Sequence, residues 1–231
     1  MRGAGNPGRI CGVLILAQML GGVLVNFVLA APLFGPPGFL VNAAPHSLQI
    51  VFSVLLGLVV GALSLAIAIT VLPVFRHYAP ALALWFVALA CVGLAAMVVE
   101  QVGVMSMLSL SEAYNSASIA ERESFQGLRI VVASARNWAH YLGLIVAGST
   151  LLVLYTVLHR FALVPRALAA FGLAAVLLQL VAVAMPLFGY SVVFLLLAPL
   201  GVSQLILAVW LIAKGFRDPE QNVRGDSRPA G

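Results

Sequence analysis

Residues 47–74 read SLQIVFSVLLGLVVGALSLAIAITVLPV, without one charged side chain. A helix needs about 20 consecutive apolar residues to cross the hydrocarbon core of a bilayer. Leu, Val, Ala and Ile dominate the stretch, and it lacks the two-residue alternation of a membrane β-barrel strand. The stretch is therefore predicted to be a transmembrane helix.

Five more runs have similar length and composition: Ile10–Ala31, Ala81–Leu108, Arg136–Leu158, Arg166–Met185 and Tyr190–Ala213. The chain is 63% hydrophobic and 8% charged, whereas soluble domains carry about 25% charged residues. We predict an all-α fold, a polytopic transmembrane bundle of six spanning helices in a single domain, residues 1–217. Residues 218–231 are polar and are predicted to form a disordered tail.

Basic residues predict how the six helices are oriented. Lys and Arg gather in cytoplasmic loops of membrane proteins. Assigning alternate connections to the cytoplasm places both termini inside, together with most of the basic residues: Arg2, Arg9, Arg76, Arg160, Arg166, Lys214, Arg217, Arg224 and Arg228. These residues flank apolar runs rather than covering a soluble face, so membrane lipids, not nucleic acid, are the expected partners. The first helix is expected to be retained, because its apolar run exceeds the 7–15 residues typical of a signal peptide.

Ionisable side chains inside a membrane are costly, which makes each one a candidate for function. Glu100 lies in the third run, and Arg136, Asn137 and His140 lie in the fourth. Counting at 1.5 Å per residue from the predicted inner boundary places Glu100 and His140 at about the same depth, roughly 28 Å. Small residues share their helix faces, which favours close helix contact. We predict that these four residues form an outward-facing polar pocket.

Two interpretations of this cluster stay open. In the first, it binds a small ligand, a lipid headgroup or an ion. In the second, Glu100 is only a structural partner for Arg136, or Arg136 and His140 anchor the helix at the membrane surface.

Catalytic chemistry is disfavoured. The sequence contains no Gly-x-Ser-x-Gly, His-Glu-x-x-His or Walker motif, and no aspartate lies within a run. Neither a metal site nor a cofactor is predicted. Haem is disfavoured because His46 and His77 fall at helix ends, where they would hold a macrocycle poorly. We therefore expect a protein that is not an enzyme.

Two alternatives to ligand binding remain. The chain could be an accessory or scaffolding subunit of a larger complex, with its small-residue faces packed on a helical membrane partner. It could also be a small permease, since residues 199–201 (Pro-Leu-Gly) interrupt the sixth run, as in transporters with broken helices.

The loop between the third and fourth runs contains a helix-start signal. Ser118 and Glu121 have the spacing of a capping box, in which each side chain satisfies an exposed amide of the other residue. A helix is therefore predicted to begin at Ile119 and to run through Gly127 into the fourth span.

Several segments resemble a family of small bacterial membrane proteins described only as a domain of unknown function, DUF4386. The segments are GRICGVL at Gly8–Leu14, FALVPR at Phe161–Arg166, LAAFG at Leu168–Gly172 and LAVWLIAKG at Leu207–Gly215. The resemblance extends from Arg9 to Phe216. It implies a multi-pass protein of the bacterial cytoplasmic (inner) membrane, without an established activity, and it carries over no functional residue.

Overall fold

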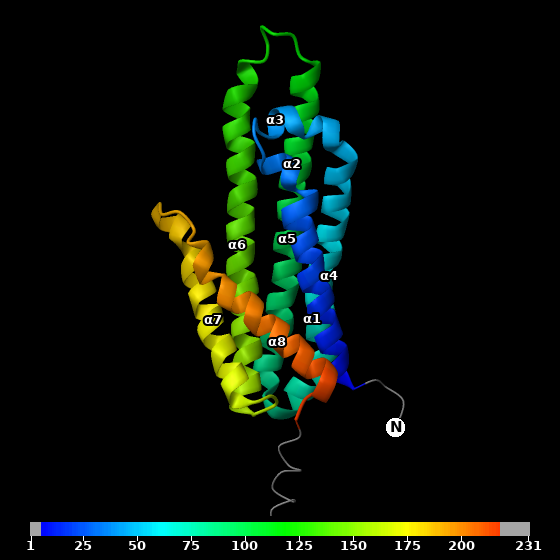
Figure 1. Ribbon diagram of the computed structural model, residues 1–231, viewed down its shortest axis with the longest axis vertical. Helices are drawn as coiled ribbons and strands as arrows, with labels where there is room; N and C mark the ends of the chain where they lie inside the picture. Colours follow the sequence, from blue (N-terminus) through cyan, green and yellow to red (C-terminus); the bar gives the residue numbers. More distant parts are fainter. Residues whose placement is uncertain (1–5, 218–231) are drawn as a thin grey trace, which may run out of the picture. The chain divides into compact units, whose positions relative to one another are not determined.

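The computed structural model describes residues 6–217 (Figure 1). All secondary-structure elements in this range are helices. Within that range, six helical segments are long and apolar enough to cross a membrane. The prediction of a six-span, all-α membrane protein is confirmed. The long helices are α1 (Pro7–Val23), α4 (Ser47–Tyr78), α5 (Pro80–Ser116), α6 (Ser124–Arg160), α7 (Arg166–Ala184) and α8 (Ala198–Lys214). The predicted disordered tail lies outside the described residues, and the placement of both termini in the cytoplasm stays a prediction.

Helices α5 and α6 extend well past the apolar runs that predicted them. Each has 37 residues, which corresponds to about 55 Å of helix, whereas the hydrocarbon core is about 30 Å thick. Residues 109–116 and 124–126, between the third and fourth runs, are therefore helical. Hydropathy missed the extension of α5, because it detects only the part of a helix that lipid covers. The extension of α6 was predicted, but from the helix-start signal and not from hydropathy.

The predicted helix start at Ile119 is wrong by five residues, since α6 begins at Ser124 after a turn. Half of the capping box is present, because Oε2 of Glu121 accepts hydrogen bonds from the amide (2.9 Å) and the hydroxyl (2.7 Å) of Ser118. These bonds lower the pKa of Glu121. The Ser118 hydroxyl thus donates to the carboxylate rather than accepting from an amide, and the segment closes as a turn. Beyond it, α6 continues helically through Gly127.

Helix α8 begins eight residues later than the predicted sixth run. Pro199 lies in its first turn, where a missing backbone N–H costs nothing. The sequence at residues 199–201 therefore opens a helix and does not interrupt one. This removes the feature that suggested a permease.

The described residues group into two compact units. Unit 1 consists of residues up to Leu16, Leu65–Ala90 and residues from Ile145 onward; unit 2 consists of Ala17–Ser64 and Cys91–Leu144. Helices α1, α4, α5 and α6 each contribute residues to both units. The single domain predicted for residues 1–217 stays a prediction.

Unit 2 contains a compact connection between α1 and α4. It runs through a π-helical segment, Leu24–Leu29, and two short helices, α2 (Ala31–Phe34) and α3 (Phe39–Asn42). Its apolar side chains are buried with residues of α4 and α5: Leu33, Phe39, Leu40, Ile50, Met107 and Leu108. In Figure 1, α2 and α3 lie beside the end of α5 that leads to the α5–α6 turn.

Two side chains of α5 form hydrogen bonds with the backbone of this connection. The hydroxyl of Ser111, which is fully buried, donates to the carbonyl of Leu40 (2.8 Å) and accepts from the amide of Ala44 (2.9 Å). Asn115 also donates to the Leu40 carbonyl (3.1 Å). These bonds satisfy backbone groups that would otherwise be buried without partners. The same connection carries Phe34, at the end of α2, which contacts the site described below.

In unit 1, helices α6, α7 and α8 enclose one part of the buried core, to which α4 and α5 also contribute residues. The phenol of Tyr155 on α6 and the hydroxyl of Ser203 on α8 share a buried hydrogen bond of 2.7 Å. The ring of Tyr155 lies directly against Gly172 of α7, leaving no space for a side chain there. A glycine at this position thus allows α6 and α7 to pack closely.

Candidate functional site

The candidate site lies in unit 2, where α5 carries Glu100 and α6 carries Arg136 and His140 one turn apart. Gly103 on α5 makes their approach possible. A Cβ at Gly103 would lie 3.0 Å from the Cβ of Arg136 and 3.2 Å from its Cα. Because no side chain separates the two backbones here, Glu100 reaches the side chains of α6 directly.

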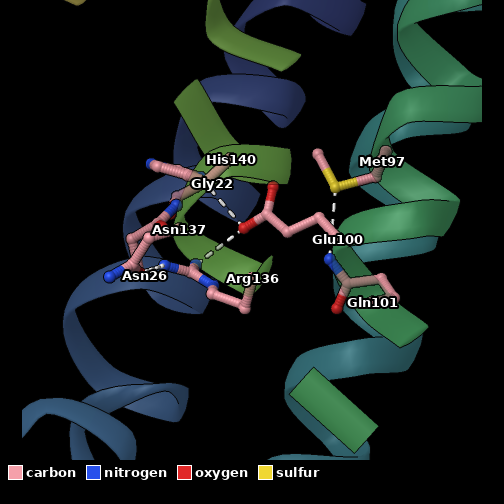
Figure 2. A network of polar contacts seen from close by, with 8 residues as sticks. All are labelled: Gly22, Asn26, Met97, Glu100, Gln101, Arg136, Asn137 and His140. Carbon is pink, nitrogen blue, oxygen red and sulfur yellow. Dashed lines mark hydrogen bonds and ion pairs between the residues drawn. The ribbon is translucent and has the colours of Figure 1, made fainter. Parts of the chain in front are cut away.

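Three ionisable groups meet at one carboxylate oxygen (Figure 2). Nη2 of Arg136 donates to Oε1 of Glu100 at 2.6 Å, and Nδ1 of His140 lies 2.9 Å from the same oxygen. The side chains of Arg136 and Glu100 are 7% and 11% exposed, whereas that of His140 is 27% exposed. Arg136 and Glu100 therefore form a buried ion pair, and His140 forms its more accessible side.

The guanidinium of Arg136 has two further neighbours. Its Cζ lies 4.9 Å from the centroid of the Phe34 ring, a cation–π contact with α2. Its Nη1 lies 3.5 Å from Oδ1 of Asn137, at the limit of a hydrogen bond. Its Nε is buried and has no hydrogen-bond partner among the described residues. Such an unpaired donor costs about 1–3 kcal/mol.

All four residues that the sequence singled out are in this cluster. Glu100, Arg136 and His140 are in direct contact, while Asn137 is exposed and touches the cluster only through Arg136. Phe34 was not predicted. It lies far away in the sequence in a loop-like connection, and no local pattern distinguishes it from any other apolar residue. Figure 2 also shows Asn26 of the π-helical segment close by, with its side-chain amide donating to the carbonyl of Gly22 near the end of α1.

A cavity of about 670 Å³ opens on unit 2, but the cluster does not line it. Its walls are mostly apolar, with only three polar side chains among the lining residues: Gln101, Ser106 and Ser109. The predicted polar pocket therefore does not coincide with this cavity.

Within the cluster, Glu100 and His140 are the two side chains of types that commonly ligate metal ions. No group of three or more His, Cys, Asp or Glu side chains that could hold a metal ion occurs in residues 6–217.

Six apolar helices, with a buried ion pair between two of them, define a polytopic helical membrane protein. The chain belongs to the family described as Domain of unknown function (DUF4386), whose model matches residues 10–215. No curated protein and no solved structure matches the chain.

Proposed function

We propose that this membrane protein binds, without converting it chemically, a small ligand or lipid headgroup that presents an anionic or carbonyl oxygen to Arg136. The unpaired Nε of Arg136 supports this proposal most directly. It is a buried donor on a charged group, and an oxygen from a ligand would satisfy it. The exposed amide of Asn137 and the partly exposed ring of His140 supply further polar contacts beside it.

Because Arg136 and His140 share one carboxylate oxygen, Glu100 can lose Arg136 as a partner and keep His140. Oε1 of Glu100 contacts both Arg136 and His140. When a ligand oxygen takes over the guanidinium, His140 continues to hold the carboxylate, so that Glu100 is not left without a partner. In a site of low dielectric constant this matters, because an unpaired buried charge is strongly unfavourable.

The variant Glu100→Gln tests this function. Glutamine keeps an oxygen for Arg136 and His140 but removes the negative charge that competes with an anionic ligand. We expect about tenfold tighter binding, or more, of inorganic phosphate or phosphatidylglycerol by the full chain, measured by native mass spectrometry from detergent. Without a bound anion the variant is expected to melt at a lower temperature, because the buried guanidinium of Arg136 loses its counter-charge. Ser106→Ala, an exposed change on the same helix, serves as the control. A loss of stability with unchanged binding of both probes would reduce the cluster to a structural clamp.

We further propose that both termini face the cytoplasm and that the protein resides in a bacterial inner membrane. The distribution of Lys and Arg supports this orientation. Reporter fusions placed after Arg76 and after Arg160 are expected to be cytoplasmic, and a fusion within the α5–α6 turn at Ser118 is expected to be periplasmic. A periplasmic reporter after Arg76 or Arg160 would contradict the orientation.

A further inference from the structure

Six cationic side chains come together at one end of unit 1, although four separate segments carry them. They are all exposed: Arg9, Arg76, Arg160, Arg166, Lys214 and Arg217. No ion pair involves any of them in the described part of the chain. We call this surface the cationic end.

Contacts within unit 1 establish that these segments are neighbours. A Cβ on Gly8 would lie 2.6 Å from the amide nitrogen of Phe216, so the start of α1 packs on the end of α8. The amide of Arg217 donates to the carbonyl of Leu163 (2.8 Å), which joins the end of α8 to the α6–α7 connection. The rings of Tyr78 and Phe161 lie 5.3 Å apart, which brings the end of α4 to the same connection.

Among the residues that the structure describes, the charge of this end is unbalanced. The described residues of unit 1 contain no Asp or Glu at all, whereas Glu100, Glu112, Glu121 and Glu123 all lie in unit 2. Six like charges on neighbouring segments repel one another. An anion bound among them would relieve that repulsion.

Two of the guanidinium groups are held against aromatic rings. Cζ of Arg217 lies 5.1 Å from the centroid of Trp210, and Cζ of Arg160 lies 5.5 Å from that of Phe161. These contacts reduce the freedom that a long side chain would lose on binding. Arg166 is the first residue of α7, where the helix dipole disfavours a cation, so its charge does not stabilise the helix.

We propose that the cationic end binds the phosphate of an anionic phospholipid. The charges lie at the ends of membrane-spanning helices, the level at which lipid headgroups meet a protein, and clusters of Lys and Arg at this level attract anionic lipids. Trp210, beside Arg217, is one of the two residue types enriched at this interface. This site is separate from the Glu100–Arg136 cluster, all of whose members lie in unit 2.

The test compares two double variants of the full chain that remove equal charge. Arg160→Gln with Arg166→Gln removes two charges from the cationic end; Arg122→Gln with Arg129→Gln removes two from unit 2. Each is titrated in detergent with phosphatidylglycerol, phosphatidylcholine or inorganic phosphate and followed by native mass spectrometry. The first variant is expected to lose at least about tenfold in affinity for phosphatidylglycerol, since each cation near an anionic surface contributes a several-fold factor. The second variant and Glu100→Gln are expected to keep that binding event.

A second pair, Arg76→Gln with Lys214→Gln, repeats the measurement from different segments and covers the case in which the first variant does not fold. Preference for phosphatidylglycerol over both phosphatidylcholine and inorganic phosphate supports the lipid as the ligand. Equal losses of phosphatidylglycerol binding in the unit 1 and unit 2 variants would overturn the proposal. So would a loss of inorganic phosphate binding in the unit 1 variants as large as their loss of phosphatidylglycerol binding.

Discussion

Replacing Arg136 by methionine is expected to lower the free energy of unfolding by about 3–5 kcal/mol, because the change leaves the buried carboxylate of Glu100 without its main counter-charge. Arg136 provides the 2.6 Å ion pair to that carboxylate, and the more exposed His140 would be its remaining partner. The measurement is thermal unfolding of the full chain in a fixed detergent. Arg129→Met is the matched control, since Arg129 is exposed on the same helix.

The double variant Glu100→Met with Arg136→Met distinguishes two contributions to the free energy of unfolding. One is the destabilisation caused by an unpaired buried charge, and the other is the net stabilisation that the ion pair provides. Replacing both members of a buried ion pair by apolar residues is often neutral or stabilising. We therefore expect the double variant to recover most of the stability lost by Arg136→Met. If the double variant were as unstable as the single one, packing of the arginine, including its contact with Phe34, would explain the loss instead.

A second large effect is expected at Gly172, where replacement by alanine should destabilise unit 1 by at least about 1–3 kcal/mol, the usual cost of an overpacked core. An added Cβ would overlap the ring of Tyr155, which is fully buried and whose hydroxyl is bonded to Ser203. The ring cannot move away without breaking that bond. The melting temperature in detergent and the yield of folded protein are the measurements.

Gly201→Ala is the control for this prediction. Gly201 is also in a helix of unit 1, but no atom lies near the Cβ that alanine would add. There the change should be neutral or stabilising by up to about 1 kcal/mol, because alanine loses less backbone entropy than glycine in a helix. Combining Gly172→Ala with Tyr155→Leu should recover part of the loss. Identical effects at Gly172 and Gly201 would contradict the packing explanation.

The sequence predicted the spans well because lipid imposes a simple rule on length and hydropathy. The predicted starts at Ser47 and Arg166 coincide with those of α4 and α7. The rule fails outside the hydrocarbon, where it says nothing about the extensions of α5 and α6. It also fails in the connection between α1 and α4, whose short helices depend on contacts with α5.

The candidate site was partly predictable for a related reason. Charged residues in an apolar run are conspicuous, and counting along two antiparallel helices placed Glu100 and His140 at one depth. Sequence spacing cannot show which atoms meet, so the shared oxygen of Glu100 and the unpaired Nε of Arg136 emerged only from the structure. The contact between Phe34 and Arg136 could not be predicted, because the two residues are far apart in the sequence.

The tie between α5 and the α1–α4 connection has a practical consequence for chimeras made within the family. Ser111 and Asn115 both donate hydrogen bonds to the carbonyl of Leu40, and Ser111 accepts one from the amide of Ala44. The connection to which they bind also carries Phe34. A transplanted segment 24–46 would keep its geometry only if the recipient also offered a hydroxyl and an amide at these two positions of its third span. Such segments should therefore be exchanged together with these two positions, since a swap of the segment alone would leave the carbonyl of Leu40 and the amide of Ala44 without their partners.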